Sequence, residues 1–285
     1  MEQEMTASGT LYVVSLPIGN LGDITLRALD VLRTVDFIVA EDTRTTQRLL
    51  AHHQIATPMF SSYYQGVEKQ RARNVLSVLA SGKSVALVSD AGTPLISDPG
   101  YPLVCGAIER AVRVVPIPGP SALMAALVVA GFAIDRFAFE GAVPRTAGAR
   151  ARLIERLEDA QQTTILYESP HRLADTLQQF AEKLPERRIA LARELTKVHE
   201  EVLRGTAAEV LTVLAERDRV RGEFVLVIDA ATQRKAASQR EAAALYRFLI
   251  KEGLPKRATQ TALMLAFGLP RNAAYDLVHR EIPSE

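Results

Sequence analysis

The sequence predicts two consecutive α/β domains followed by a small all-helical domain. Up to residue 130, short apolar strand-like runs alternate with amphipathic helical stretches, which is the pattern of a mostly parallel sheet with right-handed crossovers. Between residues 163 and 230, strand-like runs follow one another with fewer helices between them, which favours a mixed sheet. Beyond residue 240, three helical segments are punctuated by glycine and proline.

In the first domain the strand-like runs are apolar and rich in β-branched residues, as expected for strands that are buried on both faces. They occupy residues 10–15, 35–40, 84–89 and 112–117, with a weaker edge candidate at 58–63. The amphipathic stretches between them predict helices over residues 26–34, 43–53 and 68–81.

The segment 131–148 mixes glycine, proline and charge, and we place the boundary between the two α/β domains there. Strands of the second domain are predicted at 163–169, 187–194, 199–205 and 222–230. A polar linker at 231–240 precedes the helical tail. The predicted domains are therefore 1–131, 132–232 and 233–285.

The charge distribution limits the classes of partner. The formal net charge of +1 excludes binding of nucleic acid through the overall charge of the protein, but a local basic patch is still possible. Residues 231–285 carry nine Lys or Arg against five Asp or Glu. The tail is thus either a helix-turn-helix-like bundle that touches RNA phosphates or an appendage for packing and dimerisation. Its basic residues on the three helices include Lys251, Lys256, Arg257, Arg271 and Arg280.

Composition points to a protein of the reducing cytoplasm. No apolar run approaches the roughly 18 to 20 residues of a membrane span, so we expect no membrane association. The single cysteine excludes an internal disulfide, which fits a cytoplasmic location. The five histidines and one cysteine do not form a metal-ligand spacing, so we expect no metal site.

Two loops that follow predicted strands carry unusual chemistry, and ligands of open α/β sheets bind at such strand ends. In "SLPIGNLGDIT" the glycines Gly19 and Gly22 allow close approach to a ligand, although a tight turn alone would also explain them. In "AEDTRTT" Glu41 and Asp42 either hold a ribose or cap the following helix, and Arg44 among the acids favours a more specific role.

Two further strand-end loops are rigid and polar. "VSDAGTPLISDPGYP" leaves a strand through Asp90 and reaches a new helix only at Gly100, whereas such connections usually take about 2–6 residues. Its prolines and glycines fix a path with exposed amides and carbonyls, which suggests the wall of a ligand site. "PIPGPSA" ends a strand with three prolines and starts a helix at Ser121, where backbone amides can hold a ligand.

The motifs "LPIGNLGDIT", "AEDTR", "VSDAGTPLISDPGYP", "PGPSA", "YESPHR" and "ARELTK" occur in this order and at suitable spacing. Together they resemble the bacterial methyltransferases that modify the 2′-hydroxyl of a cytidine in 16S ribosomal RNA. This group is part of the tetrapyrrole-methylase-like, or class III, methyltransferases. The resemblance covers about residues 10–230, and the helical tail is similar to the extra C-terminal domain of that group.

The resemblance implies S-adenosylmethionine as the cofactor, bound in a cleft between the two α/β domains of a homodimer. It also implies 16S RNA, within the small ribosomal subunit, as the acceptor, and gives no role for DNA. The residues implied at the cofactor are Pro17, Ile18, Ser89, Asp90, Thr93, Ile96, Ser121, Ala122, Tyr167 and Glu168. The residues implied on the acceptor side are Arg44, Arg193 and Glu194.

Methyl transfer to an oxygen needs alignment of the ribose hydroxyl with the methyl group and, in addition, a proton acceptor. Candidates for the base are Glu41, Asp42, Glu168 and Lys197, of which Lys197 would need a lowered pKa. Our hypothesis is that Asp42 is the base or part of a proton path and that Lys197 polarises the oxygen. Arg44 and Arg193 would then hold phosphates of the acceptor.

Three rival functions remain. A methyltransferase for a corrin or sirohaem precursor would share the fold and the cofactor, but its many-carboxylate acceptor calls for a site lined with arginines. A nicotinamide dehydrogenase fits the position of Glu41, but the G-x-G-x-x-G motif is missing. A binding module without activity would leave four polar strand-end loops unexplained.

Overall fold

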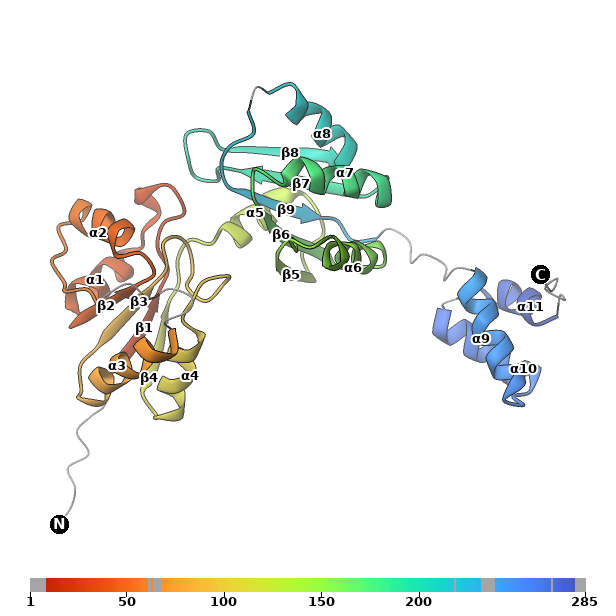
Figure 1. Ribbon diagram of the computed structural model, residues 1–285, viewed down its shortest axis with the longest axis horizontal. Coiled ribbons are helices and arrows are strands. Elements are labelled where there is room, and N and C mark those ends of the chain that lie inside the picture. The colour runs from red at the N-terminus through yellow and green to blue at the C-terminus, as the bar shows by residue number, and fades with distance from the viewer. Residues whose placement is uncertain are drawn as a thin grey trace, which may run out of the picture.

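The computed structural model describes residues 9–60, 63, 68–217, 219–231, 239–267 and 269–279. The predicted fold class is confirmed: two α/β units are followed by a bundle of three helices, and Figure 1 shows these three parts in sequence order. The linker at 232–238 and Arg280 lie outside the described residues, as do residues 1–8 at the start of the first predicted domain. The domain limits 1–131, 132–232 and 233–285 therefore stay predictions.

The first unit is built on a parallel sheet of the strand order β2-β3-β1-β4. Its strands are β1 (Thr10–Val14), β2 (Phe37–Ala40), β3 (Val85–Val88) and β4 (Arg113–Ile117). All four were predicted to within a few residues. The weaker strand expected at 58–63 is present only as an isolated bridge between Met59 and Ile38, and residues 61 and 62 lie outside the described part.

Helices cover both faces of this sheet, as in a doubly wound fold (Figure 1). The helices are α1 (Leu26–Thr34), α2 (Thr43–His52), α3 (Glu68–Ala80) and α4 (Tyr101–Glu109), with a short 3-10 turn η1 (Leu21–Asp23) before α1. Leu32 of α1 and Leu50 of α2 pack on one face against Ile38. Leu79 of α3 and Leu103 of α4 pack on the other face. Sequestering the strands on both faces leaves their carboxyl ends as the exposed edge for ligands.

The second unit contains a mixed sheet, as predicted, and its strand order is β5-β6-β9-β7-β8. Its strands are β5 (Phe137–Ala142), β6 (Thr163–Glu168), β7 (Arg188–Arg193), β8 (Glu201–Thr206) and β9 (Phe224–Ile228). Only β5 and β6 are parallel, and the remaining pairs are antiparallel. Helices α6 (Ala147–Glu158), α7 (Leu173–Lys183) and α8 (Ala207–Ala215) cover one face through a single apolar core.

Strand β5 lies within the segment 131–148, where the sequence placed the domain boundary without predicting a strand. Phe137 and Phe139 alternate with small or polar residues, which is a strand pattern, but the surrounding glycine and proline obscured it. The helix α5 (Ala122–Ala130), which the boundary at 131 assigned to the first domain, packs on the open face of the second sheet. Its residues Leu123 and Leu127 contact the core that contains Val227. By packing, the units therefore meet between β4 and α5.

The three predicted tail helices are α9 (Gln239–Lys251), α10 (Lys256–Phe267) and α11 (Arg271–His279). They enclose a small core of their own around Ala242, Leu263, Ala274 and Val278. In Figure 1 this bundle lies apart from both sheets. None of the helices in the described part of the chain is long and apolar enough to cross a membrane.

Candidate active site

A cavity of about 360 Å³ opens between the two α/β units, at the carboxyl ends of β1 and β3. One wall is the connection between β3 and α4, and a second is the start of α5 at Ser121 and Ala122. The opposite wall is formed by residues 167–170 at the end of β6 and residues 222–225 at the start of β9. This volume and position are typical of a small-molecule site in an α/β protein.

Seven of the ten residues that the resemblance placed at a cofactor line this cavity. They are Ile18, Thr93, Ile96, Ser121, Ala122, Tyr167 and Glu168. The other three, Pro17, Ser89 and Asp90, do not line it. Whether any of the ten contacts a cofactor stays a prediction.

The β3–α4 connection is a strained and firmly anchored wall. Leu95 and Ser97 have φ values of 74° and 72°, a left-handed conformation that residues with side chains adopt rarely. Gly92 exchanges two backbone hydrogen bonds with Leu16, at 2.9 and 3.0 Å. The hydroxyl of Thr93 lies 3.0 Å from that of Ser15 and donates to the carbonyl of Pro120 at 3.2 Å. The loop is thus tied to β1 and to the β4–α5 connection, and its shape is set before any ligand arrives.

Ser89 and Asp90 act behind this wall. Asp98, which lines the cavity, has its pKa raised by burial; a hydrogen bond from Ser89 lowers it, and the nearby charge of Asp90 raises it further. An Oδ1 atom of Asp90 accepts the backbone N–H of Asp42 at 2.9 Å. Ser89 therefore positions the carboxyl of Asp98 in the cavity, and Asp90 fixes the chain just after β2.

Asp42 begins α2 as its N-cap, and the guanidinium of Arg44 holds its carboxylate at both oxygens, at 3.1 and 2.6 Å. These bonds to Arg44 lower the pKa of Asp42 to about 2. Next to it, the pKa of Glu41 is raised by burial and by the charges of Asp98 and Asp90. Neighbouring carboxyls at the same strand end therefore differ in basicity, and Glu41 is the stronger base.

Lys197 connects the two units at the mouth of the cavity. Its Nζ atom lies 2.9 Å from a carboxylate oxygen of Glu194 and 3.2 Å from one of Glu223, a cavity residue. These bonds raise the pKa of Lys197 against the lowering effect of burial, so the condition for Lys197 as a base is not met. Its carbon chain packs against Gly19, where a Cβ atom would approach its Cγ to 2.4 Å.

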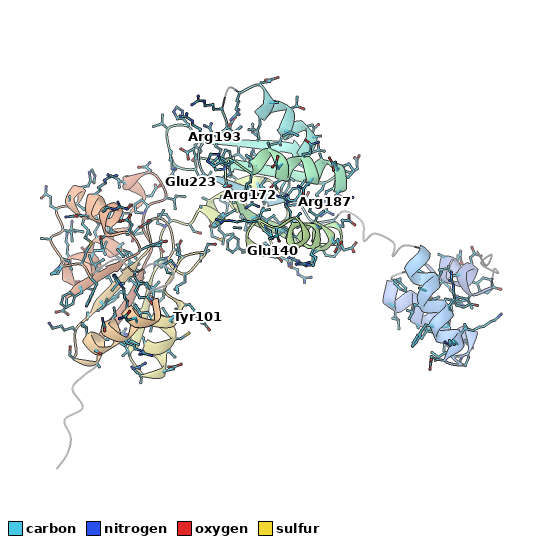
Figure 2. The ribbon with its side chains drawn as sticks, viewed as in Figure 1. Tyr101, Glu140, Arg172, Arg187, Arg193 and Glu223 are labelled. Carbon is cyan, nitrogen blue, oxygen red and sulfur yellow. The ribbon has the colours of Figure 1, made fainter. Side chains whose placement is uncertain are left out.

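Arg193 and Glu194 fasten the two segments beside Lys197 to each other. Arg193 donates through Nε to the carbonyl of Arg221 at 2.9 Å, and Glu194 accepts the N–H of Glu223 at 2.9 Å. Figure 2 shows Arg193 and Glu223 at the same end of the second unit. Arg44, by contrast, projects from α2 of the first unit and its side chain is 87% exposed. Contact of these residues with an acceptor stays a prediction.

Glu168 and Tyr167 end β6 on the cavity wall. The carboxylate of Glu168 accepts the N–H of Ser169 and the hydroxyl of Thr176, each at 2.7 Å, and its side chain is only 1% exposed. Arg172 Nη2 lies 3.5 Å from the oxygen that accepts from Thr176, so three neighbours hold this carboxylate in the wall. The phenol of Tyr167 has its pKa raised by burial and by the charge of Asp98, which places the two groups near each other.

Sequence reasoning missed part of the cavity. Gly222–Val225 at the start of β9 was read only as a strand, and Pro170 as part of a motif without a role. Gly222 has a φ of 112°, and a Cβ atom there would meet Glu194 at 2.7 Å, so a glycine before a strand was the available signal. Among the described residues no group of acids, histidines and cysteines is arranged to hold a metal ion.

The fold is shared with several methyltransferases. Cobalt precorrin-4 methyltransferase superposes with a TM-score of 0.58 at 16% identity, covering 76% of this chain and 94% of that protein. Uroporphyrin-III C-methyltransferase from Thermus thermophilus, solved with S-adenosyl homocysteine, gives 0.54 at 18% identity, with 78% and 97% covered. Diphthine synthase gives 0.60 at 16% identity, with 78% and 90% covered. At such identities the likeness establishes the fold alone.

Relatives in sequence are closer. The chain is 45% identical to "Ribosomal RNA small subunit methyltransferase I" of Xylella fastidiosa strain Temecula1, over 95% of this chain and 99% of that protein. It is 39% identical to the protein of the same name from Bacillus subtilis, with 95% and 94% covered. The family model described as tetrapyrrole (corrin/porphyrin) methylases matches residues 10–211. The chain therefore belongs to the tetrapyrrole methylase family, within its group of ribosomal RNA small subunit methyltransferases I.

Proposed function

We propose that this protein methylates the ribose 2′-hydroxyl of a cytidine in 16S RNA of the small ribosomal subunit, with S-adenosylmethionine as the methyl donor. The observation that carries the proposal is the identity of 45% with a ribosomal RNA small subunit methyltransferase over nearly the full length of both chains. The cavity between the units supplies a site of the right size for the donor. The choice of a cytidine ribose comes from the motif resemblance.

The residues of the cavity fit S-adenosylmethionine, which would supply the methyl group and depart as a neutral thioether. Asp98 presents a carboxyl whose pKa is raised by burial, so a ligand cation beside it would relieve an unfavourable charge. Tyr167 and the start of α5 offer a phenol and backbone amides for the polar parts of the ligand. A structure of a family member with S-adenosyl homocysteine supports the same class of ligand.

Of the four candidates for the base, we propose Glu41. Burial and the charges of Asp98 and Asp90 raise its pKa, whereas Asp42 is neutralised by Arg44. Glu168 is occupied by two hydrogen bonds, and Lys197 stays a cation between Glu194 and Glu223. In this arrangement Asp42 and Arg44 fix the start of α2, and Lys197 holds the mouth of the site in shape.

A tetrapyrrole acceptor is the main rival, because the family model bears that description. Such molecules carry many carboxylates and need cationic partners. The relatives in sequence argue against such an acceptor, because the chain is 45% identical to a ribosomal RNA methyltransferase over nearly its full length. The methyltransferases of corrin and porphyrin precursors with the same fold are only 16–18% identical to it.

The deciding experiment is a methyl-transfer assay with radiolabelled S-adenosylmethionine. Small subunits from cells that lack the gene and uroporphyrinogen-type acceptors would be offered in parallel. We expect label in 16S RNA, at a dinucleotide that resists alkali because its 2′-oxygen is methylated. Label in the tetrapyrrole with none in RNA would overturn the proposed acceptor. Only the proposal of S-adenosylmethionine as the methyl donor would then stand.

We further propose that the protein is a cytoplasmic homodimer. Helix α5 is apolar throughout, and Met124, Val128 and Val129 are exposed on the side turned away from the second sheet. An exposed apolar helix face is typical of a subunit interface. Light scattering should give twice the mass of the chain for the wild type and a monomer for Val128→Asp. A monomeric wild type at micromolar concentration would contradict the proposal.

A further inference from the structure

The loop between β7 and β8, residues 194–200, presents an unusually exposed apolar side chain. Val198 is 96% exposed, the highest value among the large apolar residues that the structure describes as exposed, and His199 beside it is exposed as well. A lone exposed valine is ordinary on a protein surface. At this position it stands next to Lys197, whose ammonium group contacts the cavity residue Glu223.

The backbone holds this loop in a fixed and strained shape. Glu194 and Thr196 have φ values of 48° and 68°, in the left-handed region. Three bonds close the turn: Lys197 donates its N–H to the carbonyl of Glu194, Glu200 donates to the carbonyl of Lys197, and Thr196 donates to the carboxylate of Glu200 at 2.6 Å. Strain of this kind is found at ligand-binding segments because the surrounding structure must enforce it. The tip with Val198 and His199 is therefore presented rigidly.

A second segment with exposed arginines is fastened to this loop. Arg193 donates to the carbonyl of Arg221, and Glu194 accepts the N–H of Glu223, so the chain before β9 lies against the start of the loop. The side chains of Arg219 and Arg221 are exposed. The next two residues, Gly222 and Glu223, line the cavity.

Several carboxylates near these residues are engaged in bonds within the protein. Lys197 contacts both Glu194 and Glu223, and Arg217 and Arg193 contact Glu201 at 2.6 and 3.8 Å. Glu200 caps the N–H of Thr196. Glu194, Glu201 and Glu223 thus each contact a cationic side chain of the protein, whereas the side chains of Arg219 and Arg221 are exposed. We name Val198, His199, Arg219 and Arg221 the rim.

We propose that the rim is the surface on which the acceptor RNA lies, with Arg219 and Arg221 at its phosphates and Val198 and His199 against an unstacked base next to the methylated ribose. The inference rests on the proposed function. Arginine neutralises phosphate, and RNA that is read as a single strand stacks its bases on flat side chains such as the imidazole of histidine, beside which Val198 adds an apolar contact. Both chemistries stand at the mouth of the cavity that would hold the methyl donor, so a ribose held there can reach it.

The first test replaces Val198 by the photo-crosslinker p-benzoylphenylalanine, with the same replacement at Val213 on α8 as the control, since Val213 is also an exposed valine. After irradiation with small subunits that lack the modification, we expect a cross-link at or next to the nucleotide that the wild type methylates. A cross-link confined to a remote part of the RNA, or equal labelling from both positions, would overturn the inference.

The second test measures binding of the small subunit across a salt series for Arg219→Gln and Arg221→Gln. Each substitution should reduce the slope of log affinity against log salt by about 0.7 to 0.9, the value for one lost phosphate contact. The matched control is Arg113→Gln. Arg113 is exposed and lies at the amino end of β4 in the first sheet, whereas the cavity lies at the carboxyl ends of the strands of that sheet. A slope equal to that of the wild type for both rim variants would argue against the phosphate contacts.

The third measurement is the specificity constant of the double variant Val198→Gly, His199→Ala. Loss of one base contact should lower kcat/KM for methyl transfer by about five- to 150-fold, with unchanged affinity for S-adenosylmethionine and unchanged thermal unfolding. If the wild type labels RNA and this variant does so equally well, the rim role fails while the proposed function stands. If the wild type puts no label into RNA and forms no cross-link, both fail together.

Discussion

At the scale of single residues, the carboxyls of Glu41, Asp90 and Asp98 lie close enough for their charges to act on one another at the ends of β2 and β3. Asp42 stands in the same stretch, but its charge is compensated by Arg44. The consequence is that the two adjacent carboxyls Glu41 and Asp42 differ in basicity, which the sequence alone did not reveal. "AEDTR" contains two adjacent acids. Bonds from Arg44 lower the pKa of the second, and burial together with the charges of Asp98 and Asp90 raises the pKa of the first.

This difference in basicity predicts different results for two conservative substitutions. Glu41→Gln should reduce kcat for methyl transfer by about 10²-fold or more, the usual contribution of a general base, with little change in donor affinity. Asp42→Asn, which can still cap α2, should have a much smaller effect. Single-turnover kinetics with the donor in excess would separate them, and a greater loss from Asp42→Asn would restore Asp42 as the base.

The pH dependence of donor binding follows from Asp98. Because burial raises its pKa above 3.8, the free protein loses stability as pH rises from the unfolded-state pKa through the higher folded-state pKa. A cationic ligand prefers the ionised form, so affinity for S-adenosylmethionine should rise with pH over the same window. Calorimetric titration should show this rise in the wild type and a flat profile in Asp98→Asn. Equal pH dependence in both would exclude Asp98 as the partner of the cation.

At the scale of elements, the β3–α4 connection is the part of the site that the sequence predicted best. Its prolines, glycines and length indicated a rigid ligand wall, and the loop does line the cavity. The contribution of β9 was missed because the sequence does not show what faces Gly222–Val225 across the cavity, and the glycine before the strand was a weak signal. β5 was missed because local turn residues outweighed a short alternation of two phenylalanines.

Two glycines test whether the wall needs its shape for binding. Gly92, with a φ of 73°, lies in the wall, and a Cβ atom there would approach Ile18 to 3.3 Å. Gly131, with a φ of 82°, ends α5 away from the cavity lining. Alanine at either site should destabilise the protein by about 1–2 kcal/mol through the left-handed backbone. Only Gly92→Ala should also weaken donor binding, as measured by calorimetry. Equal donor affinities of the two variants would show that the shape of the wall at Gly92 does not contribute to donor binding.

At the scale of the whole molecule, the tail helices have their own core and were predicted from proline and glycine punctuation alone. Removing residues 237–285 should therefore leave the affinity for S-adenosylmethionine unchanged. Binding to the small subunit should weaken, because the basic side chains of α9–α11 are lost with the tail. Filter binding and calorimetry would measure the two affinities, and an unchanged RNA affinity would assign the tail to packing or dimerisation instead.

The arrangement of the two units was beyond sequence reasoning, because it depends on contacts between residues far apart in the chain. Gly19 and Lys197 illustrate this. Nothing in the sequence indicates that the two residues are in contact, yet the glycine leaves room for the side chain of the lysine. The packing of α5 on the second sheet is a similar case, since an apolar helix can serve either neighbour.

Because the walls of the cavity belong to both sheets, neither unit alone possesses a binding site. The affinity for the methyl donor therefore depends on how the two units are held relative to each other. Side chains that do not contact the donor can change this affinity. Leu127 lies in the apolar layer between α5 and the second sheet, and we expect substitutions in this layer to change donor affinity. Such positions offer natural selection a way to adjust donor affinity while every contacting residue stays the same.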